Sequence, residues 1–328
     1  MPRSRRFYRS GGVYEIVIRV QEGLPFAHNK LINFIISSVI TQVNRDKKVH
    51  ICHYVWMRNH PHIILVAKDP FQMAAFYGQL KKNLTDITKR LLGEETLRMW
   101  EPRASAIELL DIQTVIDRVS YLYANPAAAN QASSISKFTG LSTWREFQDA
   151  IVSQDGIKFK IRRNLPWLRL PTIPEIGGGS ISLEEQEYII EKLCNQNKEY
   201  FELELEPNRW MSRFGINRIE EILEMNKEIL AQLKTKEDRA AQKRTFEPDP
   251  ERLSAEPLVM SHKPKKKERK IFFLTIIKET ALAFLASYSE YCRGAKLAYL
   301  YSICLGPPHP WPPGAFRPPM AQVASLLC

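Results

Sequence analysis

The sequence has few of the features that secreted, membrane-spanning and zinc-binding proteins depend on. Its five cysteines form no Cys-x-x-Cys pair and stand far apart, at Cys52, Cys194, Cys292, Cys304 and Cys328. This spacing argues against a zinc knuckle and a disulfide framework and suits a reducing cytosol. No apolar segment follows the basic N-terminus, so we expect no secretory signal. Charged residues interrupt the most apolar late segment, 271–291, so we expect no membrane span.

Acidic charge is also scarce relative to basic charge. The chain of 328 residues carries 47 Lys and Arg against 36 Asp and Glu, a net charge of +11. An excess of this sign indicates a polyanionic partner, with nucleic acid the first candidate and an acidic membrane surface the second. Hydrophobic residues make up 44% of the chain, enough for one large or two ordinary domains.

Two apolar runs meet at a polar corner, Asn59-His60-Pro61-His62. Both runs are typical of buried strands, which a hairpin or tight bend would join. His60 and His62 are two residues apart, so on a strand their imidazoles leave the same face. Two neutral imidazoles at one point form half of a divalent-metal site. The alternative is that one histidine packs at the end of the sheet while the other faces water.

The apolar spacing predicts a β-α-β-β-α-β order for the first part of the chain. The expected elements are a strand at 13–20, a helix at 29–43, the two strands around the corner, a helix at 69–91 and a strand at 97–103. This order is that of a ferredoxin-like α+β fold, an antiparallel sheet with helices on one face. The other face would be open, and RRM-like folds bind nucleic acid there.

A further helix is expected at 111–124. Pro126 should end it, because proline disfavours helical geometry in the residue before it. Tyr121 and Asn125 are four residues apart and would share one side of this helix, whereas Tyr123 points elsewhere.

Two segments resemble a known family. Residues 54–65, Tyr-Val-Trp-Met-Arg-Asn-His-Pro-His-Ile-Ile-Leu, resemble the signature of the HUH tyrosine transposases, which act on single-stranded DNA. They look most like the branch related to REP-associated tyrosine transposases. Residues 121–129, Tyr-Leu-Tyr-Ala-Asn-Pro-Ala-Ala-Ala, are similar to the family's Tyr-x-x-x-Asn-Pro-x-x-Ala segment. The resemblance covers about residues 5–150, and two motifs in the same order are more specific than either alone.

The resemblance implies a site and a reaction. Tyr121 would be the nucleophile that forms a 5′-phosphotyrosine bond and leaves a free 3′-OH, with Tyr123 as the second candidate. His60, His62 and Asn125 would bind Mg²⁺ or Mn²⁺, although Asn125 could instead only end the helix. Close relatives often carry a basic residue inside the second motif, where this chain has only alanines at 127–129. The family works as dimers, often with the tyrosine helix of one subunit serving the histidines of the other.

Several basic residues are candidates for contacts with nucleic acid. Arginines alternate with two aromatic residues in the N-terminal arm, which could bind phosphates and stack on bases or could be a solvated terminus. A dense basic cluster spans 263–270 and could be a second contact or a flexible joint. The candidates are Arg3, Arg5, Arg6, Arg9, Arg58, Lys265, Lys266 and Lys267.

Three regions are expected: a catalytic domain at 1–150, a helical extension at 151–250 that opens with a linker around 165–180, and a basic joint, amphipathic helix and Pro-rich tail at 251–328. The predicted function is a transposase or derived nuclease that cleaves and rejoins single-stranded or hairpin DNA as a homodimer. We expect neither a membrane nor a small-molecule substrate as partner, and a location in the prokaryotic cytosol near the nucleoid. The alternative is a domesticated, non-cleaving protein with an RRM-like fold that binds DNA or RNA hairpins.

Overall fold

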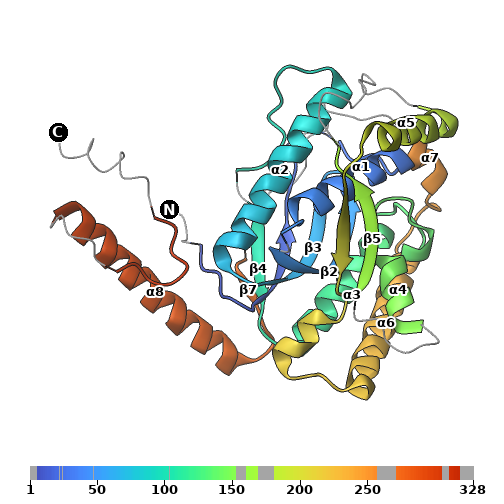
Figure 1. The fold of residues 1–328 in the computed structure, drawn as a ribbon. Coiled ribbons are helices and arrows are strands. Elements are labelled where there is room, and N and C mark those ends of the chain that lie inside the picture. Colours follow the sequence, from blue (N-terminus) through green and yellow to red (C-terminus); the bar gives the residue numbers. More distant parts are fainter. Residues whose placement is uncertain are drawn as a thin grey trace.

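A sheet with seven strands in the described part of the chain forms the centre of the computed structural model (Figure 1). The structure describes residues 6–21, 23, 25–46, 48–102, 104–152, 160–168, 181–256, 271–304 and 310–317. In spatial order the strands are β5 (Ile161–Pro166), β6 (Tyr200–Leu205), β2 (Val49–Met57), β3 (His60–Ala67), β1 (Val13–Val17), β4 (Ser105–Leu109) and β7 (Phe273–Leu274). Helices accompany a sheet whose central strands are antiparallel, so the fold is α+β.

The four central strands are antiparallel, and two outer strands join them in parallel. β1 lies between β3 and β4, and β2 pairs with the outer side of β3. β6 runs parallel to β2, and β7 runs parallel to β4. The register places Val17 opposite His62 and Met57 opposite His60, so β2 and β3 form a hairpin whose corner carries both histidines.

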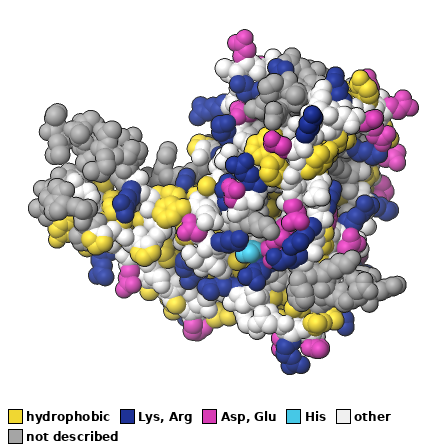
Figure 2. Space-filling view, in the orientation of Figure 1, with side chains coloured by type: hydrophobic (Ala, Val, Ile, Leu, Met, Phe, Trp, Pro, Cys, Tyr) yellow, Lys and Arg dark blue, Asp and Glu magenta, His cyan; other side chains and the backbone are white. Residues whose placement is uncertain are grey.

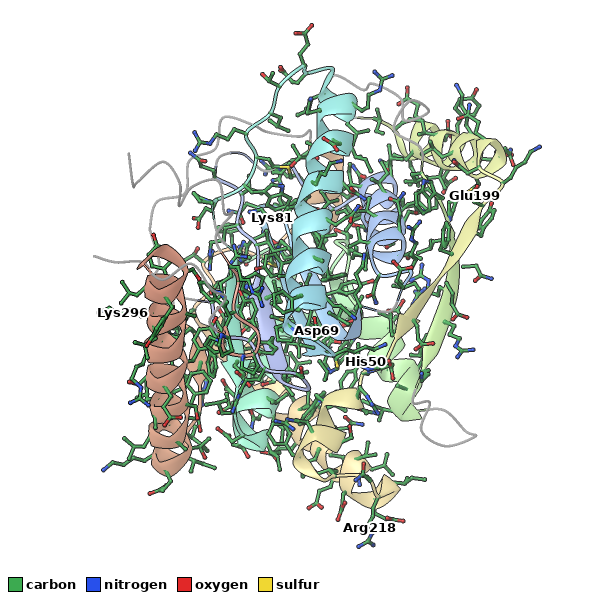
Figure 3. All side chains as sticks on the ribbon, turned by 60° about the vertical axis from the view of Figure 1, so that its left-hand side comes forward. His50, Asp69, Lys81, Glu199, Arg218 and Lys296 are labelled. Atoms are coloured by element: carbon green, nitrogen blue, oxygen red, sulfur yellow. The ribbon has the colours of Figure 1, made fainter. Side chains whose placement is uncertain are left out.

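One face of the sheet is covered mainly by α1 (Lys30–Val43) and α2 (Pro70–Leu92), and Leu193 of α5 (Leu183–Gln196) packs into the same core. Their starts are encoded locally, because the side chain of Asn29 caps α1 and that of Asp69 caps α2. Figure 3 shows Asp69 at the start of α2. α2 begins with Pro70 at its first position and ends at Gly93, whose φ of 69° is readily adopted only by glycine. The core on this face includes Tyr14, Trp56 and Leu65.

The opposite face is covered as well, mainly by α3 (Ile112–Ala128) and α6 (Ile219–Gln242). The prediction of helices on one face only, with the other face open, is therefore wrong. The reason is visible in the strands: Val55, Ile64 and Val66 point toward α3 and are buried. Strands that are apolar on both faces need a layer on each side.

Two predicted boundaries also differ from the structure. The expected strand at 97–103 is replaced by β4, which begins after Pro102, a residue that lacks the N–H a strand ladder needs. The backbone of Trp100 pairs with Val20 in an isolated bridge rather than in a strand ladder. α3 continues through Pro126 to Ala128, so Asn125 does not end it.

The region expected to be a helical extension also contributes to the sheet. Its strands β5 and β6 pair with each other and continue the sheet beyond β2, and β5 includes Leu165 and Pro166, the first two residues of the segment that was expected to be a linker. Of the rest of that segment, residues 169–180 lie outside the described residues. The sheet thus extends across residue 150. Among the described residues, the helical elements of this region are α5 (Leu183–Gln196), the 3-10 helix η3 (Arg209–Phe214) and α6. The short η1 (Ile135–Lys137) lies before the region, α4 (Trp144–Val152) crosses its start, and α7 (Pro250–Ala255) begins at its last residue.

The C-terminal helix α8 (Lys278–Cys304) stands apart from the sheet in Figure 1. Its aromatic residues hold the N-terminal arm, since Phe7 packs against Tyr291 with ring centroids 4.9 Å apart. Hydrophobic side chains are exposed along α8, among them Leu282 and Leu285, and Figure 2 shows such side chains on this side of the molecule. None of the described helices has the length and apolar character needed to cross a membrane.

Candidate active site

A buried carboxylate joins three elements at the corner of the β2–β3 hairpin. Glu15 of β1 is fully buried and accepts hydrogen bonds from His62 Nδ1 at 2.7 Å and from Arg118 Nε and Nη2 at 2.7 and 2.8 Å. Burial alone would raise the pKa of Glu15, but the hydrogen bonds and charges of His62 and Arg118 lower it to about 2. A charge at such a position is stable only when it is paired and hydrogen-bonded.

His60 and His62 lie on the same face of β3, with ring centroids 5.0 Å apart. Each Nδ1 has a partner: His60 Nδ1 is 2.6 Å from Asn59 Oδ1, and His62 Nδ1 binds Glu15. Both partners are oxygen acceptors, so each Nδ1 can donate its proton, and in the neutral form of either ring Nε2 then has a lone pair. Burial, with the charges of His62 and Arg19, lowers the pKa of His60 to about 2.

Tyr121 projects from α3 next to this pair. Its ring centroid is 6.1 Å from that of His62, and the Arg118 guanidinium carbon lies 4.2 Å from the ring centre. The side chain is 37% exposed, so the phenol is accessible to a ligand. The predicted nucleophile and the predicted histidines are therefore brought together within one chain.

Tyr123, the second candidate nucleophile, is placed differently. It is fully buried, and its hydroxyl lies 2.9 Å from His53 Nδ1 and 3.0 Å from Thr143 Oγ1. Burial raises its pKa well above the usual value. This phenol has the contacts of a structural residue, and no substrate phosphate could reach it without unpacking α3.

Asn125 lies one turn after Tyr121 and is 8% exposed. Its Nδ2 has no hydrogen-bond partner, and no hydrogen bond joins Asn125 to either histidine among the described residues. The same part of the chain contains no group of three His, Cys, Asp or Glu side chains suited to hold a metal. The two histidines share one face as half of a metal site would require, and His62 also has the carboxylate on its second ring nitrogen that is usual for a metal-binding histidine, whereas His60 has the amide oxygen of Asn59 there.

Of the candidate nucleic-acid contacts, three are described and all three have partners in the protein. Arg9 forms an ion pair of 2.7 Å with Glu108, and Arg6 lies over the ring of Phe316. Arg58 is 6% exposed and pairs with Glu256 through Nη1, while its Nε and Nη2 have no hydrogen-bond partner, so a phosphate contact there would require the guanidinium to be uncovered. The other candidates, Arg3, Arg5, Lys265, Lys266 and Lys267, lie outside the described residues.

The two residues that the sequence-based prediction missed are Glu15 and Arg118. A signal for Glu15 was present: one acidic residue stands within the apolar strand Val13–Val17, and a buried carboxylate requires a partner. The sequence did not indicate that Arg118 is one of these partners, because it lies 103 positions away from Glu15.

Comparison with known proteins adds little to this geometry. No protein-family model and no curated protein sequence matches the chain. Among solved structures, the chain is similar to a REP-associated tyrosine transposase bound to a REP hairpin, with 20% sequence identity, coverage of 45% of this chain and 86% of that chain, and a TM-score of 0.37. A similarity at this level is too weak to assign a fold or a function.

Proposed function

We propose that the chain is an HUH-type tyrosine nuclease that cleaves and rejoins single-stranded DNA at hairpin-forming ends, as a transposase does. The observation that carries the proposal is that Tyr121 lies beside the histidine pair. The ring centroids of Tyr121 and His62 are 6.1 Å apart, and those of His60 and His62 are 5.0 Å apart. The two sequence motifs support the same assignment. The strand order β4-β1-β3-β2 supports a ferredoxin-like core beneath them.

In the proposed reaction the Tyr121 hydroxyl oxygen attacks the phosphorus of a DNA phosphodiester. The bond from tyrosine oxygen to phosphorus forms as the bond to the 3′ oxygen breaks, and the leaving oxygen takes up the proton that the phenol loses. The products are a 5′-phosphotyrosine and a free 3′-OH, and attack of a 3′-OH on the phosphotyrosine reverses the step and rejoins the strand.

His60 and His62 would hold Mg²⁺ or Mn²⁺ through their Nε2 atoms, with Asn125 as the third ligand. The ion, when bound, supplies positive charge to the phosphate oxygens and orients the phosphate. Glu15 has two roles in this arrangement: it orients the ring of His62, and it anchors Arg118 against the ring of Tyr121. One buried carboxylate thus positions the nucleophile and one ligand together. The partners proposed are hairpin DNA and a second copy of the chain, in the cytoplasm.

A non-cleaving protein that binds DNA or RNA hairpins is the second candidate. The residues near the histidine pair favour this candidate, because among the described residues no third His, Cys, Asp or Glu side chain joins the pair to form a metal site. A neutral amide such as that of Asn125 is a weaker ligand than a carboxylate. The two candidates differ in one product, the covalent adduct.

The test is to incubate the protein with a single-stranded hairpin oligonucleotide and Mn²⁺ and to separate the products on a denaturing gel. A label at the 3′ end should stay with the protein, whereas a label at the 5′ end should be released on a fragment with a free 3′-OH. Tyr121→Phe should bind the hairpin and give no adduct. A wild-type protein that binds the hairpin in the presence of Mn²⁺ without forming an adduct would leave the non-cleaving candidate.

A further inference from the structure

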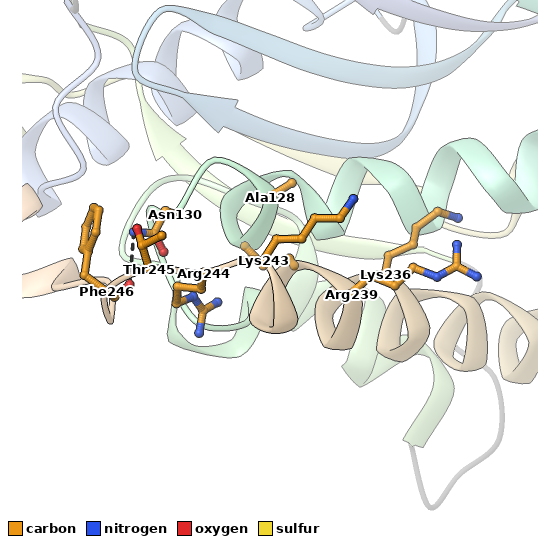
Figure 4. Close-up of a pocket in the computed structure, with 10 residues that line it drawn as sticks. Ala128, Asn130, Lys236, Arg239, Lys243, Arg244, Thr245 and Phe246 are labelled. Atoms are coloured by element: carbon orange, nitrogen blue, oxygen red, sulfur yellow. Dashed lines mark hydrogen bonds between the residues drawn. The ribbon is translucent and has the colours of Figure 1, made fainter.

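A basic pocket of about 390 Å³ lies where the C-terminal end of α3 meets the last turns of α6 (Figure 4). Its volume is within the range of ligand-binding clefts. Among the residues that the structure describes, no acidic side chain lines it. The lining residues are Ala127, Ala128, Asn130, Lys236, Arg239, Ala240, Lys243, Arg244, Thr245 and Phe246.

The cations of the pocket are not all used by the protein. Lys236 donates to Asp117 Oδ1 at 2.8 Å and to Ser120 Oγ at 2.7 Å, which fastens α6 to α3. Arg239 and Lys243 are exposed, and neither forms an ion pair with the described part of the chain. They are four residues apart on one helix face, where like charges repel, so an anion bound between them would be stabilising.

An aromatic ring stands beside these cations. Phe246 is 69% exposed, and its backbone carbonyl accepts a hydrogen bond from Asn130 Nδ2 at 3.3 Å. Asn130 is the one described residue other than glycine with a positive φ, 53°, and it follows the end of α3. The backbone of Phe246 is therefore tied to the helix that carries Tyr121, while its ring remains open to a ligand.

The position of the pocket relates it to the proposed active site. Ala128 lies seven residues after Tyr121, which is two helical turns, so it is on the same side of α3 and about 10 Å further along the axis. Lys236 contacts Asp117, one turn before Tyr121. A strand that lies along this side of α3 would pass both Tyr121 and the pocket.

The geometry points to a binding site for single-stranded DNA in which Arg239 and Lys243 contact backbone phosphates and an unpaired base stacks on Phe246. Proteins that bind single strands usually combine basic side chains that contact the phosphate backbone with aromatic rings on which bases stack. This inference deepens the proposed function and rests on it for the identity of the strand. It assigns to α6 the positive charge that the alanines at 127–129 cannot supply.

The test is fluorescence anisotropy with a labelled hairpin oligonucleotide that carries a single-stranded extension, measured over a range of salt concentrations. Replacing both cations, Arg239→Ala with Lys243→Ala, should weaken binding by roughly tenfold. It should also reduce the slope of log affinity against log salt by about 1.4, the value for two phosphate contacts on a single strand. The matched control is Lys227→Ala with Lys234→Ala, because these residues are exposed on the same helix about 120–180° around it.

Phe246→Ala should weaken binding by roughly five- to a hundredfold without changing the salt slope, since it removes a stacked base and no charge. Tyr188→Ala, at a ring that is 65% exposed on α5, is the control and should have no effect. Unchanged affinity and slope in the Arg239/Lys243 variant would overturn the inference, even if wild-type protein forms the Tyr121 adduct. If the Arg239/Lys243 variant loses binding while the wild-type protein forms no adduct, the pocket is a DNA-binding site but the protein is not a nuclease.

Discussion

Glu15→Gln is the substitution that tests the proposed site most specifically. The carboxylate accepts from His62 and twice from Arg118, all within 2.8 Å. A glutamine of the same shape has one oxygen and one NH₂ group, so one of the two partners would face a donor instead of an acceptor. Arg118 would also lose its counter-charge at a side chain that is only 20% exposed.

Breaking a buried ion pair on one side costs about 3–5 kcal/mol. We expect the lower end, about 3 kcal/mol, because Arg118 retains some contact with water. Loss of the carboxylate behind a ligand histidine should weaken Mn²⁺ binding by roughly 10–100-fold. Urea denaturation measures the first effect, and the electron paramagnetic resonance signal of free Mn²⁺ measures the second.

Glu108→Gln is the matched control, because Glu108 is also buried, at 2% exposed, and pairs with Arg9 rather than with the histidines. It should lower stability and leave Mn²⁺ affinity unchanged. Equal Mn²⁺ affinity in the wild type and Glu15→Gln, each measured under conditions where it is folded, would refute the role of Glu15 in positioning His62.

Two further predictions concern the buried side chains of Tyr123 and His28. Tyr123→Phe leaves His53 Nδ1 without the hydroxyl it binds at 2.9 Å, so it should lower the free energy of unfolding, measured by urea denaturation, by about 1–3 kcal/mol. DNA cleavage should persist, and loss of cleavage in the folded variant would contradict this prediction. Burial lowers the pKa of His28 to about 3, below its value of about 6.5 in the unfolded chain. As pH drops below about 6.5 the unfolded state therefore binds a proton that the folded state does not, and the stability of the fold decreases. His28→Leu should therefore reduce the slope of stability against pH between 6 and 4.5 by up to about 1.4 kcal/mol per pH unit, and an unchanged slope would exclude His28 as a source of it.

The sequence predicted those parts of the fold that depend on local pattern. The strands on either side of Asn59, the helices that begin after Asn29 and Asp69, and the placement of Tyr121 on a helix all follow from apolar spacing and caps. The second helical layer was missed because the spacing of a strand shows that a face is apolar but not which distant segment covers it.

Long-range pairing explains the remaining differences. β6 joins β2 although about 150 residues separate them, and Leu165, which looked like part of a linker, lies in β5 opposite Phe201. The contacts of Glu15 with His62 and Arg118 have the same origin, since they join three elements that only the folded sheet brings together. Spacing along the chain could identify the histidine pair, but not the carboxylate behind it.

The central claim is that the Tyr121 phenol becomes covalently attached to DNA. The most direct measurement is mass spectrometry of the tryptic peptide 119–137 after reaction with a hairpin oligonucleotide, Mn²⁺ and nuclease digestion. This peptide contains both Tyr121 and Tyr123, and fragmentation distinguishes them. We predict a nucleotide linked through a 5′-phosphate to Tyr121 and none on Tyr123; an adduct on Tyr123, or an unmodified peptide from protein whose DNA has been cut, would contradict the account.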